Sequence, residues 1–221
     1  MSILEVRHLQ KSFWQGGNQI PVLKDFNAQI DAGQSLAITG ESGVGKSTLL
    51  HCLGLLDSFE AGEILFEGQS ISELSEKDRV LLRREKIGFV FQFHYLMAEL
   101  SALENVMIPL KLLGRDESEC RRKASFWLEK VGLAHRLEHR PGALSGGEQQ
   151  RVAIARALVK EPKIIFADEP TGNLDPETAK KVFTVLEERC RELNAAFLMT
   201  THNMELAGRL QKQGHLKEGR L

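Results

Sequence analysis

Residues 40–48 have the composition and spacing of a phosphate-binding loop, because they follow the pattern G-x-x-x-x-G-K-[S/T]. In order, the residues are Gly40, Glu41, Ser42, Gly43, Val44, Gly45, Lys46, Ser47 and Thr48. Glycines let such a loop curl until successive backbone N–H groups point inward, and the following helix adds partial positive charge at its N-terminus. Lys46 would then reach the β- and γ-phosphates of a nucleotide, and the Ser47 hydroxyl would hold Mg²⁺. The alternative is a glycine-rich turn with a solvated lysine.

Two neighbouring carboxylates follow an apolar run at residues 163–167. A buried strand that ends in Asp-Glu fits a hydrolytic site, in which Asp168 belongs to the Mg²⁺ shell and Glu169 acts on the attacking water. Gln92 and His202 also come at the ends of apolar, β-like runs. Ligands gather outside the carboxyl ends of strands in open α/β sheets, so these four side chains could converge on one site. The alternatives are an acidic turn after a strand and a structural histidine.

Residues 144–148 open a long predicted helix and read Leu-Ser-Gly-Gly-Glu. Ser145 and Glu148 have the spacing of a capping box, which would explain them without any function. Gly146 and Gly147 are harder to explain, because each glycine disfavours a helix by roughly 0.8–1 kcal/mol relative to alanine. We therefore expect something to approach the backbone closely here. The N–H groups of this helix start, together with Ser145, would suit a second anion site.

The elements that must position these residues begin with β-like patterns. Residues 3–39 indicate an antiparallel β-lobe that ends, at residues 35–39, in the strand before the phosphate loop. A short strand pair is expected at residues 63–66 and 87–91, with a charged helical segment between the two strands. The next part of the chain, residues 93–160, is largely helical in pattern.

The last third of the sequence returns to alternating strands and helices. After the strand at residues 163–169, Asp175 and Pro176 predict a helix start, with Asp175 as the N-cap. A final buried strand is expected at residues 196–200. In the β-lobe, Phe13 and Trp14 could each stack on a nucleotide base or pack against the protein.

Composition limits the classes of function that fit. The 221 residues, 42% of them hydrophobic, can bury one good core, or one core with a smaller lobe. A formal charge of −1 and a pI near 6.7 disfavour nucleic acid as the main partner. Three widely spaced cysteines indicate a reducing compartment without a disulfide or zinc site. We find no signal-type segment, and the longest apolar runs are too short to span a bilayer, so another chain must do any spanning.

Taken in order, the motifs resemble those of the ATP-binding cassette (ABC) ATPases over essentially the whole chain. The motifs, with the positions that carry them, are the Walker A at residues 40–47, the Q-loop at Gln92, the signature at residues 144–148, the Walker B at Asp168 and Glu169, the D-loop at residues 173–175 and the switch histidine at His202. The resemblance implies an α/β P-loop NTPase with an antiparallel β-subdomain, a mixed α/β core and a helical signature subdomain. It implies a single ATPase domain over residues 1–221, with the β-subdomain and core in residues 1–92 and 161–221 and the helical subdomain in residues 93–160.

The resemblance also implies the chemistry. ATP would be hydrolysed with Mg²⁺ held by Ser47, Gln92 and Asp168, and with Glu169, His202 and Gln92 as the catalytic residues. Phe13 would stack on the base where tyrosine is more usual, which leaves Trp14 for packing.

Two chains would form a head-to-tail homodimer around two ATP molecules. Each nucleotide would lie on residues 40–48 of one chain and meet residues of the other chain, namely Ser145, Gly146, Gly147, Glu148 and Asp175.

Within the family, the nearest resemblance is to the ATPases of bacterial lipoprotein-releasing transporters. Residues 92–97, 102–106, 108–110 and 139–141 carry it. It implies a peripheral protein at the cytoplasmic face of the inner membrane, with permease subunits docked near residues 93–106 and no nucleic acid partner. The alternatives are an ATPase of a macrolide-efflux or cell-division complex, the latter without transported cargo, and a soluble ABC ATPase that acts on nucleic acid or ribosomes. The departures from the family pattern are Phe13 and Asn203, where aspartate commonly follows the switch histidine.

Overall fold

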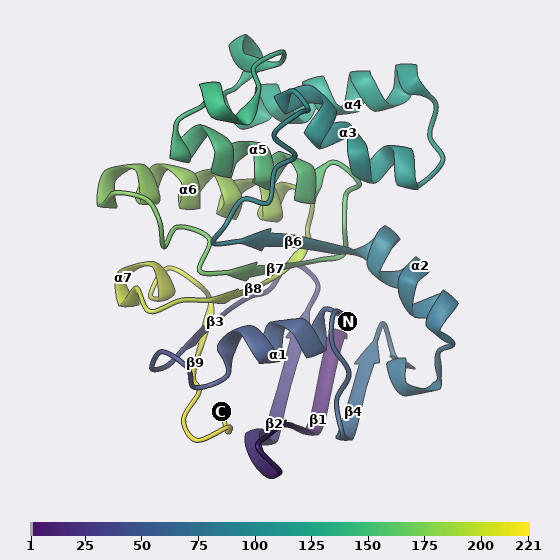
Figure 1. Ribbon diagram of the computed structural model, residues 1–221, viewed down its shortest axis with the longest axis vertical. Helices are drawn as coiled ribbons and strands as arrows, with labels where there is room; N and C mark the ends of the chain where they lie inside the picture. The colour runs from purple at the N-terminus through teal and green to yellow at the C-terminus, as the bar shows by residue number, and fades with distance from the viewer. Residues whose placement is uncertain (1) are drawn as a thin grey trace.

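Two β-sheets of different kinds contain the strands of the computed structural model, which describes residues 2–221 (Figure 1). The antiparallel sheet has the strand order β2-β1-β4-β5, and its strands are β1 (Ser2–Gln15), β2 (Asn18–Asp31), β4 (Ala61–Phe66) and β5 (Gln69–Ser70). The parallel sheet has the order β6-β7-β8-β3-β9, and its strands are β3 (Ser35–Thr39), β6 (Ile87–Phe91), β7 (Ile164–Asp168), β8 (Ala196–Thr200) and β9 (Lys212–His215). The antiparallel subdomain and the separate α/β core that the resemblance implies are therefore present.

The antiparallel lobe is built on the long hairpin of β1 and β2. Gly16 and Gly17 form its two-residue turn with φ values of 57° and 83°, a conformation that suits glycine. Along β1, Leu4 and Val6 are buried while Arg7 is exposed, as expected for a strand with one face on a core. The predicted antiparallel lobe is thus confirmed for residues 2–31, but the strand at residues 35–39, which was expected to end the lobe, belongs to the parallel sheet.

The expected strand pair at residues 63–66 and 87–91 is wrong, although both strands exist. β4 pairs antiparallel with β1, whereas β6 pairs parallel with β7 in the other sheet. The helix α2 (Glu76–Lys86) leads from one sheet to the other. Pairing partners are set by contacts distant in sequence, and the local pattern does not contain them.

Helices cover both faces of the parallel sheet (Figure 1). On one face, α1 (Lys46–Leu53) lies in a core shared with the antiparallel lobe, to which the sheet contributes Ile38 and Leu198. On the other face, alternate residues of the same strands, such as Ala37 and Met199, join a second core with the remaining long helices. Those helices are α3 (Ala102–Leu112), α4 (Glu117–Lys130), α5 (Gly146–Leu158) and α6 (Pro176–Glu192). A parallel sheet buried on both faces is the expected consequence of apolar strand sequences without alternation.

The helix starts follow the predicted capping residues. Ser145 and Glu148 form a complete capping box at α5, as do Ser101 and Glu104 at α3. Asp175 caps α6, and Pro176 is its first residue. The helices α3, α4 and α5 all fall within residues 93–160 and stand at one end of the molecule in Figure 1, beyond α6. A short helix, α7 (Met204–Ala207), follows β8, and short 3₁₀ turns occur at Ile71–Glu73, Ala134–Arg136 and Pro141–Ala143. Over residues 2–221, no helix has the length and hydropathy needed to cross a bilayer.

Candidate nucleotide-binding site

The loop between β3 and α1 has the backbone that its glycines predict. Gly45 has a φ of 109°, and a Cβ there would come within 2.5 Å of Val22 Cγ1 on β2. Only glycine therefore fits at this position, where the loop packs against the antiparallel lobe. Lys46 begins α1, and its Nζ donates to the Gly40 and Glu41 carbonyl oxygens at 2.9 Å each. The lysine thus arches back over its own loop.

A cavity of about 430 Å³ opens beside this loop and brings the predicted catalytic residues together. Its lining consists of Ser42, Gly43, Gly45, Lys46, Ser47, Thr48, Gln92, Asp168, Glu169 and His202. These residues come from the phosphate loop, the first turn of α1 and the carboxyl ends of β6, β7 and β8. The convergence expected from the strand ends is therefore confirmed as geometry. The set combines a lysine cation, three hydroxyls and two carboxylates within one volume large enough for a polyphosphate.

Asp168 is positioned by a neighbour that sequence analysis did not single out. Thr200 Oγ1 donates to Asp168 Oδ1 at 2.6 Å, and Thr200 is fully buried. The two residues are register partners on β7 and β8. The signal available in the sequence was that Thr200 precedes Thr201 and His202 at a strand end, but only the register identifies its partner.

Glu169 and His202 form a second fixed pair. His202 Nδ1 lies 2.9 Å from Glu169 Oε1, and the Glu169 side chain is 15% exposed while that of His202 is 70% exposed. The backbone of Glu169 is left-handed, with a φ of 45°. A non-glycine residue held in this region costs on the order of 1–3 kcal/mol, which is a feature of functional sites. The Glu169 N–H donates to the Thr200 carbonyl at 3.0 Å and helps to fix this conformation.

Gln92 connects the cavity to the segment before α6. Its Nε2 donates to Asn173 Oδ1 at 3.0 Å, and Asn173 Nδ2 donates back to the Gln92 carbonyl at 3.2 Å. The carbonyl of Phe91, the residue before Gln92, accepts a hydrogen bond from Gln150 Nε2 of α5 at 3.1 Å. A displacement of Gln92 would therefore be felt both in the D-loop and in the helical part of the chain.

The signature residues lie elsewhere. Ser145 Oγ accepts from the Glu148 N–H at 3.3 Å, and Glu148 Oε2 accepts from the Ser145 N–H at 2.8 Å. The Ser145 backbone N–H lowers the pKa of Glu148 most, with a smaller contribution from Arg136, whose Nε donates to Glu148 Oε1 at 3.0 Å. Within residues 2–221, the lining of the 430 Å³ cavity includes none of the residues 145–148.

Gly147 has a close neighbour within the chain. A Cβ on Gly147 would come within 2.5 Å of Thr178 Cγ2 on α6. The close approach expected at this helix start is therefore made, in part, by α6 rather than by a ligand. Gly146 is less crowded, since the nearest atom to its added Cβ would be Leu174 Cδ2 at 3.5 Å.

Asp175, Phe13 and Trp14 also lie outside the lining of that cavity in the described part of the chain. Asp175 Oδ1 accepts from the Glu177 and Thr178 N–H groups at 3.2 and 3.1 Å. Phe13 is 44% exposed and Trp14 71% exposed. The expected packing role of Trp14 is wrong, because most of this residue is exposed.

Comparison with known proteins gives a consistent result. Residues 23–172 match the protein family described as "ABC transporter". Two curated relatives are the lipoprotein-releasing system ATP-binding proteins LolD of Hahella chejuensis and Pseudoalteromonas translucida. The first is 48% identical over 98% of this chain and 94% of the relative, and the second is 46% identical over 99% and 94%.

A solved structure, the ATP-binding cassette MJ0796 as a dimer in a post-hydrolysis state bound to ADP and Pi, superposes with a TM-score of 0.90. It is 36% identical and covers 99% of this chain and 96% of the other. The family match spans more than half of the chain, and the relatives match nearly its full length. The chain therefore belongs to the ABC transporter family and is one of its ATP-hydrolysing subunits.

Proposed function

We propose that this chain powers the release of lipoproteins from the bacterial inner membrane, as the ATPase of a transporter whose permease subunits resemble LolC and LolE. It would act as a peripheral homodimer at the cytoplasmic face. The observation that carries the proposal is the identity of 46–48% with the LolD relatives over 98–99% of this chain, since it extends well beyond the nucleotide site.

ATP binds, in this proposal, with its phosphates on residues 40–48 and its adenine on Phe13. The loop glycines and the N-terminus of α1 supply N–H donors, and Lys46 exchanges its two carbonyl partners for phosphate oxygens. The exposed Phe13 ring offers a face for stacking. Support for this geometry comes from the contact between Gly45 and Val22, which holds the loop against the hairpin that carries Phe13.

Mg²⁺ fits the donors that share the cavity with Lys46. Asp168 gives a carboxylate, Ser47 a hydroxyl and Gln92 an amide oxygen, and such hard oxygen donors are the ones this ion prefers. No group of three or more His, Cys, Asp or Glu side chains able to hold a metal occurs in residues 2–221. Mg²⁺ bound largely through phosphates and water needs only one or two carboxylates, so the site is sufficient.

Hydrolysis would depend on Glu169 and His202. The carboxylate, held by the histidine at 2.9 Å and by its constrained backbone, orients water for attack on the γ-phosphate and accepts its proton. Lys46 and Mg²⁺ would stabilise charge on the transferred group.

The homodimer follows from the separation of the two anion-binding features. Ser145, Gly146, Gly147, Glu148 and Asp175 would contact the nucleotide of the partner subunit. In support, Ser145 is exposed at the start of the 13-residue helix α5, whose N–H groups can bind a phosphate, but it lies outside the cavity of its own chain. The solved relative MJ0796 is a dimer.

Permease subunits would dock near residues 93–106. Phe93, Tyr95 and Met97 are exposed there, an arrangement that suits a partner with apolar side chains. The Tyr95 ring meets the Phe91 ring edge to face, and Phe91 lines a groove of about 530 Å³ that also contains basic side chains, namely Arg83, Arg84, Arg156 and Lys160. Arg156 of α5 donates to the His94 and Tyr95 carbonyls at 2.6 and 2.7 Å. These hydrogen bonds tie the proposed docking segment to α5 of the helical subdomain.

Depletion of the chain in its own host tests the proposed function. Outer-membrane lipoproteins should accumulate in the inner-membrane fraction, and restored expression of the wild-type chain should reverse this. Glu169→Gln should fail to do so, while the matched variant Glu129→Gln, on an exposed site of α4, should succeed. Normal lipoprotein distribution after depletion, with macrolide sensitivity or a division defect instead, would reject lipoprotein release in favour of the efflux or cell-division alternative.

A further inference from the structure

Lys11 is a buried charge on β1 with two partners beyond the end of α1. Lys11 is 7% exposed, and its Nζ lies 3.0 Å from Asp57 Oδ2. The same Nζ donates to the Ser58 carbonyl at 2.7 Å. The helix α1 starts at the phosphate loop and ends at Leu53, four residues before Asp57. Lys11 therefore ties the antiparallel lobe to the segment that follows the phosphate-loop helix.

The same ammonium group lies 5.0 Å from the centroid of the Phe13 ring. Lys11 and Phe13 are two residues apart on one strand, so their side chains emerge on the same face of the sheet. A cation at this distance is attracted to an aromatic face. Because Phe13 remains 44% exposed, Lys11 supports the ring without covering it.

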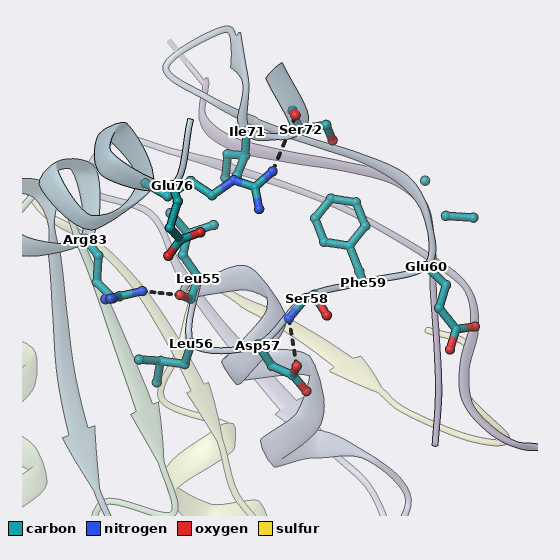
Figure 2. A pocket seen from close by; sticks show the side chains of 13 residues that line it. Leu55, Leu56, Asp57, Ser58, Phe59, Glu60, Ile71, Ser72, Glu76 and Arg83 are labelled. Atoms are coloured by element: carbon teal, nitrogen blue, oxygen red, sulfur yellow. Dashed lines mark hydrogen bonds between the residues drawn. The ribbon is translucent and has the colours of Figure 1, made fainter. Parts of the chain in front are cut away.

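The anchor of Lys11 is itself fixed. The Ser58 N–H donates to Asp57 Oδ1 at 2.7 Å, a contact visible in the wall of the pocket of about 590 Å³ shown in Figure 2. Glu60, from the same wall, accepts from the Ser12 N–H at 3.1 Å, and its own N–H donates to the Gln10 carbonyl at 3.0 Å. The backbone on both sides of Lys11 is thus held to the segment that carries its partners.

The phosphate loop approaches the same part of the hairpin. Val22, the close neighbour of Gly45, lies on β2 between the residues that pair with Lys11 and Ser12. A nucleotide with its phosphates on the loop would therefore have its base directed toward this end of the hairpin, where Phe13 lies.

Given the stacking of adenine on Phe13 proposed above, we propose that Lys11 is a positioning residue for the base, holding the Phe13 ring in the orientation that adenine meets. An exposed aromatic side chain that is free to change rotamer must be ordered when the base binds, and pre-ordering it lowers that cost. Lys11 acts through Phe13 and makes no contact with the nucleotide of its own. Its effect is confined to ligands that carry a base.

Two ligands separate this role from a purely structural one. Dissociation constants are measured for ATP and for inorganic tripolyphosphate, each with Mg²⁺, on the full chain. Lys11→Met should raise the constant for ATP by about 3–10-fold and leave that for tripolyphosphate within about 2-fold. Lys11→Arg, which keeps the cation, should rescue ATP binding. If Lys11→Met weakened the binding of both ligands equally, Lys11 would only support the fold. If ATP binding were unchanged, Lys11 would have no role. Either result overturns the inference.

Two further variants keep the outcome interpretable. Asp57→Asn retains Lys11 but weakens its anchor, so it should weaken the binding of ATP and not that of tripolyphosphate. This variant keeps the test open even if Lys11→Met does not fold. Phe13→Ala tests the stacking itself: unchanged ATP affinity in this variant would reject the proposed base contact. If Phe13→Ala weakens ATP binding while the Lys11 and Asp57 variants do not, stacking stands and only the role of Lys11 fails.

Discussion

Glu169 shows how a single residue in this site is held against its own backbone preference. Its φ of 45° is unfavourable for a side chain with a Cβ, and it is maintained by an N–H bond to the Thr200 carbonyl and by contact with His202. The neighbouring Asp168 is fixed by the buried Thr200 hydroxyl. Both carboxylates therefore have defined positions at the edge of the cavity, as a water-orienting group and an ion ligand require.

Replacement of Glu169 by glutamine should separate binding from hydrolysis. The amide keeps the size of the side chain but is a very poor proton acceptor, so the rate of ATP hydrolysis should fall by about 10²–10⁴ while the dissociation constant for ATP changes little. The measurements are phosphate release and equilibrium ATP binding.

Lys46→Ala provides the contrast, because it removes a charge that holds phosphate and should weaken binding as well as turnover. The exposed Glu129→Gln serves as the matched control and should leave both quantities unchanged. Wild-type hydrolysis by Glu169→Gln would contradict the role given to this carboxylate.

The loop residues that line the cavity could be predicted from their motif. Gln92, Asp168, Glu169 and His202 could be predicted because they stand at the ends of apolar runs, and strand ends of a parallel sheet share one edge. The contacts that hold the site residues in place could not be predicted. The bond from Thr200 to Asp168 depends on the register of two strands that lie 32 positions apart in the chain. The packing of Gly147 on Thr178 depends likewise on how two helices meet.

At the scale of elements, Lys160 links the end of α5 to the end of α2. Its Nζ donates to the Arg83 and Arg84 carbonyls at 3.1 and 2.7 Å, which satisfies acceptors at the C-terminus of α2. Burial, with a smaller contribution from the charge of Arg83, lowers the pKa of the Lys160 ammonium to about 8. The contact thus joins the helical lobe to the crossover between the sheets.

This lysine predicts a pH-dependent stability. The pKa falls from an ordinary value of 10.5 to about 8 on folding, so the unfolded chain binds more protons between these two values. The free energy of unfolding should therefore rise with pH through this window, and below about pH 8 the full penalty of the buried charge applies. Lys160→Met removes this titration. Relative to that variant, the wild type should gain on the order of 1–3 kcal/mol between pH 7.5 and pH 10, measured by denaturant unfolding. Parallel pH profiles for the two proteins would contradict the assignment.

The bounds of strands and helices were predicted better than the pairing of the strands. The bounds of β3, β6 and β8 agree with the sequence pattern because these buried strands are continuous apolar runs, and the starts of α5 and α6 agree because their capping residues are local signals. The pairing of β4 with β1 and of β6 with β7 was missed, since both strands carry the same local pattern.

At the scale of the whole molecule, the two anion-binding features do not meet within one chain. The phosphate loop and the strand ends form one cavity, while Ser145 stands at the exposed start of α5 and lies outside the lining of that cavity. Two copies arranged head to tail would bring each loop to the signature helix of the other. The account of hydrolysis thus depends on two chains sharing each nucleotide.

Complementation between two inactive variants tests this dependence directly. Ser145→Asp keeps an N-cap acceptor for α5 but places a negative charge against the γ-phosphate, with Ser145→Asn as the uncharged control. Lys46→Ala disables the phosphate loop. Heterodimers of Ser145→Asp and Lys46→Ala, isolated through two different affinity tags, contain one composite site with an intact loop and an intact signature helix. They should recover a substantial part of the wild-type ATPase rate, well above either parent. Doubly tagged heterodimers that remain as inactive as the parents would contradict the shared site.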